Sequence, residues 1–318
     1  DPLIMAFRYS QCDCFINFLS MTTTEVRRPR IHAGWLRVLI FCVAYLLLIL
    51  SGVFLMGLLI HRIKGEAANA DLLMKGEMLW AVILAIFAGS LAVTYIFRRW
   101  IDRRSFFSLG FRWRKRGADI VAGISLALSM LGLATLILWA TGHLKWTDII
   151  FDGPTLFIAM INLMLVAVYE EVVFRGYILG NLMESFTPWT ALTLSAGLFT
   201  LFHLANPGFD FLSVVSLFAF GLLLGMNYLY TRNLWFAIGF HFAWNFLEGP
   251  ILGYPVSGIH FGTLLQTDLK GDDNITGGTF GLEGSFIVTS LCIFSLLALY
   301  FILRKKFGSV SRPVTRPE

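Results

Sequence analysis

Long runs of apolar residues, separated by short polar connections, dominate the chain. A run of about 20 apolar residues is long enough to cross a bilayer as a helix. Eight runs can be placed by their length and their polar flanks, and we expect each to be helical, because an open sheet edge cannot face lipid. The pattern predicts an all-α, polytopic membrane protein with about eight transmembrane helices. The predicted spans are residues 36–60, 78–97, 118–141, 155–181, 189–205, 212–230, 233–248 and 285–303.

Composition supports this class and excludes a soluble domain. Of the 318 residues, 57% are hydrophobic and only 14% are charged, and the mean hydropathy is +0.73. No soluble domain can bury that much apolar surface. The net charge of +5 is therefore interpreted as a topology signal, and no nucleic-acid partner is expected.

The basic residues concentrate in three places: before the first span, after the second and after the eighth. With eight spans these places share one side of the membrane, so both termini are predicted to be cytoplasmic, at the inner membrane if the source is bacterial. The basic loop 98–116 is interpreted as a solvated topology signal, with contact to anionic lipid as the alternative. The polar, glycine-rich loop 249–284 is expected to be flexible and extracytoplasmic. The basic residues counted are Arg27, Arg28, Arg30, Arg37, Arg98, Arg99, Arg103, Arg104, Arg112, Arg114, Lys115, Arg116, Arg304, Lys305 and Lys306.

The pattern predicts one membrane domain, at residues 35–307, between an N-terminal tail (1–34) and a C-terminal tail (308–318). Residue 1 is Asp, and Met21 is a candidate start, so residues 1–20 are given no functional role. The four cysteines show no zinc-ligand spacing and imply no disulfide framework.

The fourth predicted span carries Glu170, Glu171 and Arg175 near its middle. An ionisable residue at the centre of a membrane helix costs about 2.5–3.5 kcal/mol on insertion scales, so such residues are functional by default. Glu171 and Arg175 are four residues apart and share a helical face. We therefore predict that Glu171 and Arg175 form an ion pair and that Glu170 stays outside this pair, available for a functional role. The alternative is a purely structural ion cluster.

Two other predicted spans carry polar residues within motifs of the same four-residue spacing. Phe199 and His203 lie in the fifth span, and His241 and Asn245 lie in the seventh. His203 alone is explained as well by a buried histidine that is bound to a backbone carbonyl or a serine. The pair His241 and Asn245 alone is explained as well by hydrogen bonds between helices. Polar groups on three separate spans together predict an intramembrane polar cavity that the helices enclose.

The residue types in this cavity suit hydrolysis. Glu170 would act as a general base on a water molecule, and His203 would position or polarise that water. His241 and Asn245 would stabilise the oxyanion that forms on the attacked carbonyl group. In a linear placement of the spans, His203 falls nearer the far side of the membrane than Glu170, and a tilted or deeper helix would be needed to bring them level.

The ordered motifs Glu170-Glu171-x-x-x-Arg175, Phe199-x-x-x-His203 and His241-x-x-x-Asn245 resemble those of the CPBP family. That family includes type II CAAX prenyl endopeptidases and bacterial relatives linked to bacteriocin processing or immunity. The resemblance covers residues 155–248, which it marks as the catalytic core. The glycine spacing at Gly221 and Gly225, which predicts close helix packing, fits it as well.

The resemblance implies an α-helical intramembrane protease whose cavity opens toward the cytoplasm and whose substrate is a lipidated (CAAX-type) or membrane-embedded peptide. By this comparison Glu170 and His203 match a water-activating pair, and His241 and Asn245 match an oxyanion-stabilising pair. The supporting positions are Glu171, Arg175 and Phe199.

A metal remains an alternative at this site. Glu170, His203 and His241 are residue types that zinc accepts, but the chain has no His-Glu-x-x-His motif. A reaction without a metal or other cofactor is therefore favoured. Two other functions stay open: a non-catalytic immunity or scaffold protein of the same family, and a proton-coupled transporter. The second is disfavoured because no paired broken helices occur in two matching halves.

Overall fold

The structure is a computed structural model that describes residues 28–64, 76–113 and 116–310. The prediction for residues 1–20 and most of the predicted C-terminal tail lie outside these ranges. The described chain is mainly helical. Its helices are α2 (Gly34–Lys64), α4 (Gly76–Ile96), α5 (Gly117–Ala140), α6 (Gly153–Glu171), α7 (Gly180–Ser185), α8 (Pro188–Leu201), α9 (Phe211–Thr231), α10 (Trp235–Phe246), α11 (Asp273–Thr276) and α12 (Phe286–Phe307). Short π-helical segments are η1 (Phe97–Ile101), η3 (Val172–Leu179) and η4 (Leu247–Ile251), and 3₁₀ turns are η2 (Phe106–Leu109) and η5 (Leu282–Gly284).

Six helical stretches in the described ranges are long and apolar enough to cross a membrane, which supports a multi-pass membrane protein. The prediction of eight full spans is wrong in two places. Helix α8 has 14 residues, and α10 has 12 and continues directly into the five residues of η4. At 1.5 Å per residue, α8 is about 21 Å long and α10 with η4 is about 26 Å long, both less than the ~30 Å hydrocarbon layer. The six candidates are Gly34–Leu58, Trp80–Ile101, Gly117–Ala140, Gly153–Ser185, Phe211–Thr231 and Phe286–Phe307.

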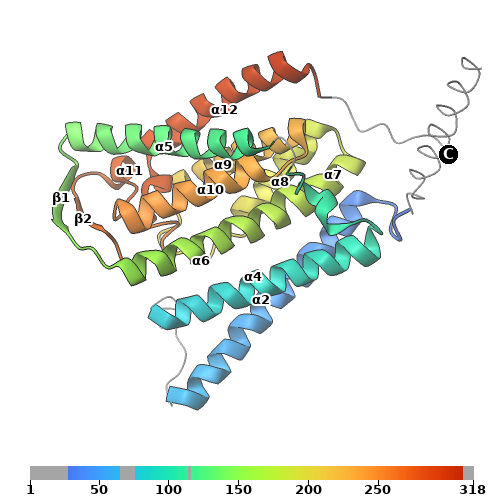
Figure 1. The fold of residues 1–318 in the computed structure, drawn as a ribbon, viewed down its shortest axis with the longest axis horizontal. Coiled ribbons are helices and arrows are strands. Elements are labelled where there is room, and N and C mark those ends of the chain that lie inside the picture. Colours follow the sequence, from blue (N-terminus) through green and yellow to red (C-terminus); the bar gives the residue numbers. More distant parts are fainter. Residues whose placement is uncertain (1–27, 65–75, 114–115, 311–318) are drawn as a thin grey trace, which may run out of the picture.

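The short helices are surrounded by long ones. Helix α10 packs against both α5 and α6, α8 packs along α9, and α12 covers α5 and α9 (Figure 1). Helices α2 and α4 contact each other, α2 also packs against α7 and α4 against α6, and α2 extends away from the other helices at one end (Figure 1). The expected close packing at Gly221 and Gly225 is confirmed, because a Cβ atom there would lie 2.8 Å from Ala196 and 2.4 Å from Leu192 of α8.

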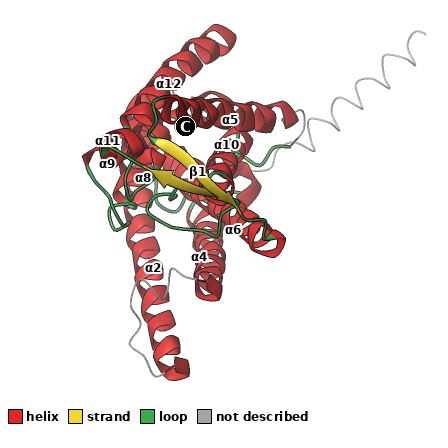
Figure 2. Ribbon diagram, turned by 90° about the vertical axis from the view of Figure 1, so that its left-hand side faces the viewer, coloured by secondary structure: helices red, strands yellow, loops and turns green. Residues whose placement is uncertain are grey.

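A small sheet closes one end of the helical bundle, so the all-α prediction needs a correction. Strands β1 (Leu144–Ile149) and β2 (Leu265–Leu269) pair antiparallel across that end (Figures 1 and 2). The register runs from Leu144 opposite Leu269 to Ile149 opposite Leu265. The loop 249–284, expected to be flexible, is instead folded: it contains the end of η4 and all of β2, α11 and η5, and it contacts α9 and α12.

The helix that carries the acidic motif runs through the middle of the core. Every residue of η3 is buried, including Arg175, and the apolar ones belong to a cluster shared with α2, α8 and α9. A second apolar cluster fills the space between α5, α9 and α10. The η3 segment is therefore packed on all sides, whereas α6 before it exposes Phe157 and Met164.

A buried group of ion pairs ties α2, α7 and the connection after α4 together. Asp102 accepts hydrogen bonds from Arg37 at 3.0 Å and Arg98 at 2.8 Å, and Glu184 pairs with Arg37 and Arg104. We call these five residues the ion-pair cluster. Arg98 is buried, so the interpretation of the basic loop 98–116 as a solvated signal is wrong for this residue, because the carboxylate of Asp102 lies opposite it. Arg37 is buried as well, against Asp102 and Glu184.

Candidate active site

Glu171 is the structural centre of the site. Its Oε1 atom accepts hydrogen bonds from Arg175 Nη1 at 2.8 Å and from His241 Nδ1 at 2.9 Å. The predicted Glu171–Arg175 pair is therefore present and fully buried. The Arg175 guanidinium also lies 4.3 Å from the centre of the Phe199 ring, in a cation–π contact that fixes its orientation.

Glu170 faces two imidazoles. Its Oε2 atom is 3.9 Å from His203 Nε2 and 3.8 Å from His241 Nε2, beyond hydrogen-bond distance. Oε2 is buried without a hydrogen-bond partner among the described residues, whereas Oε1 accepts from the Tyr169 hydroxyl at 3.3 Å. Glu170 is thus the free carboxylate that the sequence predicts. We call Glu170, Glu171, Arg175, His203 and His241 the site cluster.

The hydrogen bonds of the two histidines set which nitrogen faces Glu170. His203 Nδ1 lies 2.8 Å from the carbonyl oxygen of Phe199, and His241 Nδ1 lies 2.9 Å from the Glu171 carboxylate. Both partners are acceptors, so each Nδ1 carries a proton and donates it. Each ring therefore turns its Nε2 atom toward Glu170.

The lengths of the motif helix and α8 explain how His203 comes level with Glu170. The motif helix continues to Ser185 and α8 begins at Pro188. Glu170 lies 15 residues before Ser185 and His203 lies 15 residues after Pro188, so the two are about equally far from the connection between the helices. The Ser195 hydroxyl of α8 donates to the carbonyl of Phe174 in η3 at 3.0 Å, which fixes α8 against the motif helix. The expected mismatch in depth therefore does not occur.

Asn245 lies one turn after His241 on the same face of α10. Its side chain is buried, with 6% of its surface exposed. No hydrogen bond joins its amide to any residue in the described ranges, so the amide is available to a ligand. Six of the seven predicted site residues are thus in mutual contact (Glu170, Glu171, Arg175, Phe199, His203 and His241), and Asn245 lies one turn further along α10.

The zinc alternative can be tested against this geometry. Neighbouring ligand atoms in a tetrahedral zinc site lie about 3.3 Å apart, given zinc–ligand distances near 2.0–2.1 Å. The separations of 3.8 and 3.9 Å around Glu170 are wider, and no group of three possible ligands in the described part of the chain is arranged to hold a metal ion. The residues as placed do not fit zinc.

With this geometry established, the chain can be compared with known proteins. A family model described as type II CAAX prenyl endopeptidase Rce1-like matches residues 152–247. This segment is an Rce1-like domain. No curated protein and no solved structure gives a significant match to the chain. The Rce1-like domain includes every predicted site residue and all the helices that carry them.

Sequence reasoning missed three acidic or hydroxyl residues near the Rce1-like site. Tyr169 precedes the motif and binds Glu170. Glu248, fully buried with both carboxylate oxygens unpartnered among described residues, lies seven residues after His241, a helical spacing that could have revealed it. Glu283, with 5% of its surface exposed, lies beyond the domain, and its position in a polar loop gave no signal.

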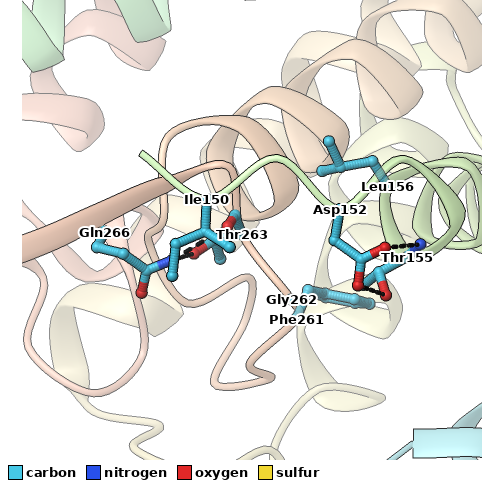
Figure 3. Close-up of a pocket in the computed structure, with 8 residues that line it drawn as sticks. All are labelled: Ile150, Asp152, Thr155, Leu156, Phe261, Gly262, Thr263 and Gln266. Carbon is cyan, nitrogen blue, oxygen red and sulfur yellow. Dashed lines mark hydrogen bonds between the residues drawn. The ribbon is translucent and has the colours of Figure 1, made fainter. Parts of the chain in front are cut away.

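A surface pocket of about 270 Å³ lies away from this site. It is at the start of α6, next to the sheet, and contains none of the predicted site residues (Figure 3). The polar side chains there bind one another: Asp152 accepts from Thr155, and Gln266 donates to Thr263. We assign this pocket no part in the chemistry.

Proposed function

We propose that the chain is an intramembrane endopeptidase that hydrolyses a peptide bond with a water molecule activated by Glu170. The observation that carries this proposal is the buried Glu170 Oε2 atom, which has no hydrogen-bond partner among described residues and is faced by two imidazole Nε2 atoms at 3.8–3.9 Å. Separations of this size suit a bridging water. The match of residues 152–247 to an Rce1-like endopeptidase family supports the reaction type.

The hydrogen-bond roles define how the water would be held. His203 donates through Nδ1 to the Phe199 carbonyl, so Nε2 of the neutral ring is an acceptor. A water molecule can then give one hydrogen to Glu170 Oε2 and the other to His203 Nε2. Its lone pair is left to attack the scissile carbonyl carbon, while Glu170 takes the proton as general base.

His241 and Asn245 would stabilise the oxyanion. With Nδ1 bound to Glu171, a doubly protonated His241 can donate from Nε2, and the negative Glu171 favours that imidazolium. The Asn245 amide, unused by any described residue, supplies a second donor to the oxyanion. Collapse of the tetrahedral intermediate breaks the C–N bond, and Glu170 returns its proton to the leaving nitrogen.

The substrate class follows from the surroundings of the site and from the family. The described chain has six helical stretches that are long and apolar enough to cross a membrane, one of them carries the buried Glu170 and Glu171, and the matched family is named for prenyl endopeptidases. We therefore propose that the substrate is a membrane-associated peptide, either prenylated at a CAAX-type C-terminus or embedded in the bilayer.

Both chain termini are proposed to be cytoplasmic. Labelling of single cysteines at Lys305 and at Asp268, from each side of the membrane, tests this topology.

The decisive experiment compares wild type with Glu170→Gln in cleavage of a prenylated CAAX peptide and of a membrane-peptide library. Removal of a general base should lower the cleavage rate about 10²- to 10⁴-fold. Asp268→Asn, at an exposed acid of the sheet, is the matched control and should cleave like wild type.

Two outcomes would contradict the proposal. Cleavage that a chelator abolishes and zinc restores would assign Glu170, His203 and His241 to a metal site. A Glu170→Gln variant that replaces the wild-type protein in cells without a change of phenotype would contradict the proposal and favour the non-catalytic scaffold protein.

A further inference from the structure

His203 is the one proposed catalytic residue that no helix carries. It lies in the turn 202–210, between α8 and α9. Within this turn the backbone N–H of Asn206 donates to the carbonyl of His203 at 3.0 Å. His203 is also bound to α8, because its backbone N–H donates to the carbonyl of Thr200 at 3.0 Å and its Nδ1 donates to that of Phe199 at 2.8 Å. The distance of His203 from Glu170 therefore depends both on α8 and on what holds the turn in place.

A chain of hydrogen bonds joins this turn to residues beyond the Rce1-like domain. The Asn206 side-chain amide donates to the backbone carbonyl of Ser257 at 3.1 Å. The Ser257 hydroxyl in turn donates to Glu283 Oε2. Ser257 has a left-handed backbone, with φ of 46°, a conformation that a non-glycine residue adopts at a cost and keeps only when its surroundings enforce it.

Backbone contacts accompany this chain. A Cβ atom at Gly258 would lie 2.2 Å from the carbonyl oxygen of Pro207, and one at Gly208 would lie 2.3 Å from the Thr279 hydroxyl. The Gly258 N–H also donates to the carbonyl of Phe280 at 2.8 Å. The turn and the segment 253–285 therefore touch at distances that only glycine permits, and movement of one must move the other.

We propose that Glu283 is a positioning residue for the cleavage reaction, which acts through Ser257 and Asn206 to hold His203 at its distance from Glu170. This inference rests on the proposed function and deepens it, because it extends the working site to a segment outside the matched domain. Glu283 is not itself given a chemical step. It is buried, and its carboxylate is near enough to His203, His241 and Glu170 to interact with them electrostatically.

A neutral replacement at this position should preserve the contact. Burial raises the pKa of the Glu283 carboxyl above its usual value, opposed by the Ser257 hydrogen bond and by the nearby histidines. Glutamine matches the shape of the protonated acid, and its carbonyl oxygen can still accept from Ser257. Glu283→Gln should therefore rescue what Glu283→Ala loses.

The first test measures kcat and KM for Glu283→Ala, Ser257→Ala and the double variant. Displacement of a reacting group by about 1 Å can cost 10²-fold in rate, so we expect each single variant to lower kcat by about 10- to 100-fold with KM within about twofold. Because both act in one chain, the double variant should be no slower than the slower single variant. Glu283→Ala should add nothing in a His203→Ala background. Additive losses, or an equal loss in the His203→Ala background, would overturn the proposal.

The second test needs no substrate. Hydrogen exchange of the backbone amides in the turn 202–210 should be at least about 10-fold faster in Glu283→Ala and Ser257→Ala than in wild type, because local opening becomes easier. Glu283→Gln should exchange like wild type. The matched control is Gln266→Ala, which removes hydrogen bonds to Thr263 in the same segment but far from the turn, and it should change neither exchange in the turn nor kcat.

The two tests separate this inference from the proposed function. Wild-type rates in Glu170→Gln would end the proposed function while the exchange measurement still reported whether Glu283 holds the turn. Unchanged exchange in Glu283→Ala would end the positioning role while the general base remained intact. If cleavage by His203→Ala is below detection, hydrogen exchange in the turn 202–210 of Glu283→Ala decides whether Glu283 has the positioning role.

Discussion

The ion-pair cluster and the site cluster are both groups of charged side chains that include residues of the long helical stretch Gly153–Ser185, yet they differ in how completely their carboxylates are satisfied. In the ion-pair cluster, Asp102 Oδ1 faces Arg37 and Tyr177, and Oδ2 faces Arg98 and Asn181. Both oxygens of Glu184 are also bound to arginines. In the site cluster, one oxygen of Glu170 and one of Glu171 are buried without a partner among the described residues.

This difference separates a structural group from a functional one. A buried polar atom without a partner costs stability, so a protein keeps one only where another requirement outweighs that cost. The ion-pair cluster fastens α2 and the connection after α4 to the end of the motif helix. The site cluster instead holds one carboxylate open and directs two imidazoles at it. Substitutions should therefore have opposite effects on stability in the two groups.

The largest expected effect is at Asp102. Asp102→Ala leaves Arg37 and Arg98 buried beside fewer negative charges, and removal of one partner of a buried ion pair costs about 3–5 kcal/mol. The free energy of unfolding, measured by denaturant titration in a single detergent, should fall by that amount. An exposed acid such as Asp268 provides the control, since Asp268→Ala should change the free energy of unfolding by less than about 0.5 kcal/mol. Equal effects at the two positions would show that the ion-pair cluster does not stabilise the fold.

The two clusters also differ in how far the sequence predicts them. The site cluster was predicted because polar residues four apart stand out within apolar runs, and because a helix brings such residues onto one face. The sequence does not predict the ion-pair cluster, because Asp102 and Glu184 are 82 positions apart and only the folded chain brings them to Arg37. Basic residues near a membrane boundary also have an ordinary explanation in topology, which hid their pairing.

The ends of the short helices had no signal in the apolar pattern. Residues 198–205 continue the run past the true end of α8 at Leu201, with His203 as the single ionisable side chain. The segment 249–284 was expected to be flexible because glycine and polar residues are typical of loops. Its glycines instead permit close backbone contacts, as at Gly258, which depend on distant parts of the chain and cannot be read from local sequence.

A smaller effect, of opposite sign, is expected at Glu170. Glu170→Gln replaces a buried carboxylate that has an unpartnered oxygen by a neutral amide of the same shape, which costs less to bury. Its free energy of unfolding should stay equal to wild type or rise by about 1 kcal/mol, even though cleavage is lost. Thermal and denaturant unfolding in the detergent used for Asp102→Ala measure this directly. A loss of 3 kcal/mol or more, as at a buried ion pair, would mean that Glu170 is a structural residue and that the two clusters do not differ in kind.

The smallest expected effect is at Tyr169, the one side chain in the described ranges that donates a hydrogen bond to Glu170. Its hydroxyl donates to Glu170 Oε1 at 3.3 Å, a long hydrogen bond. Tyr169→Phe should lower the free energy of unfolding by about 0.5–1.5 kcal/mol, the usual net value of one hydrogen bond. Loss of the Tyr169 hydroxyl also frees Oε1 and lets the Glu170 carboxylate rotate away from the two imidazoles, so kcat should fall by about 3- to 10-fold, with KM unchanged.

The matched control for both measurements is Tyr95→Phe, at an exposed tyrosine on α4. A Tyr169→Phe variant that loses as much activity as Glu170→Gln would show instead that the hydroxyl takes part in proton transfer, and Glu170 would then act as one member of a pair.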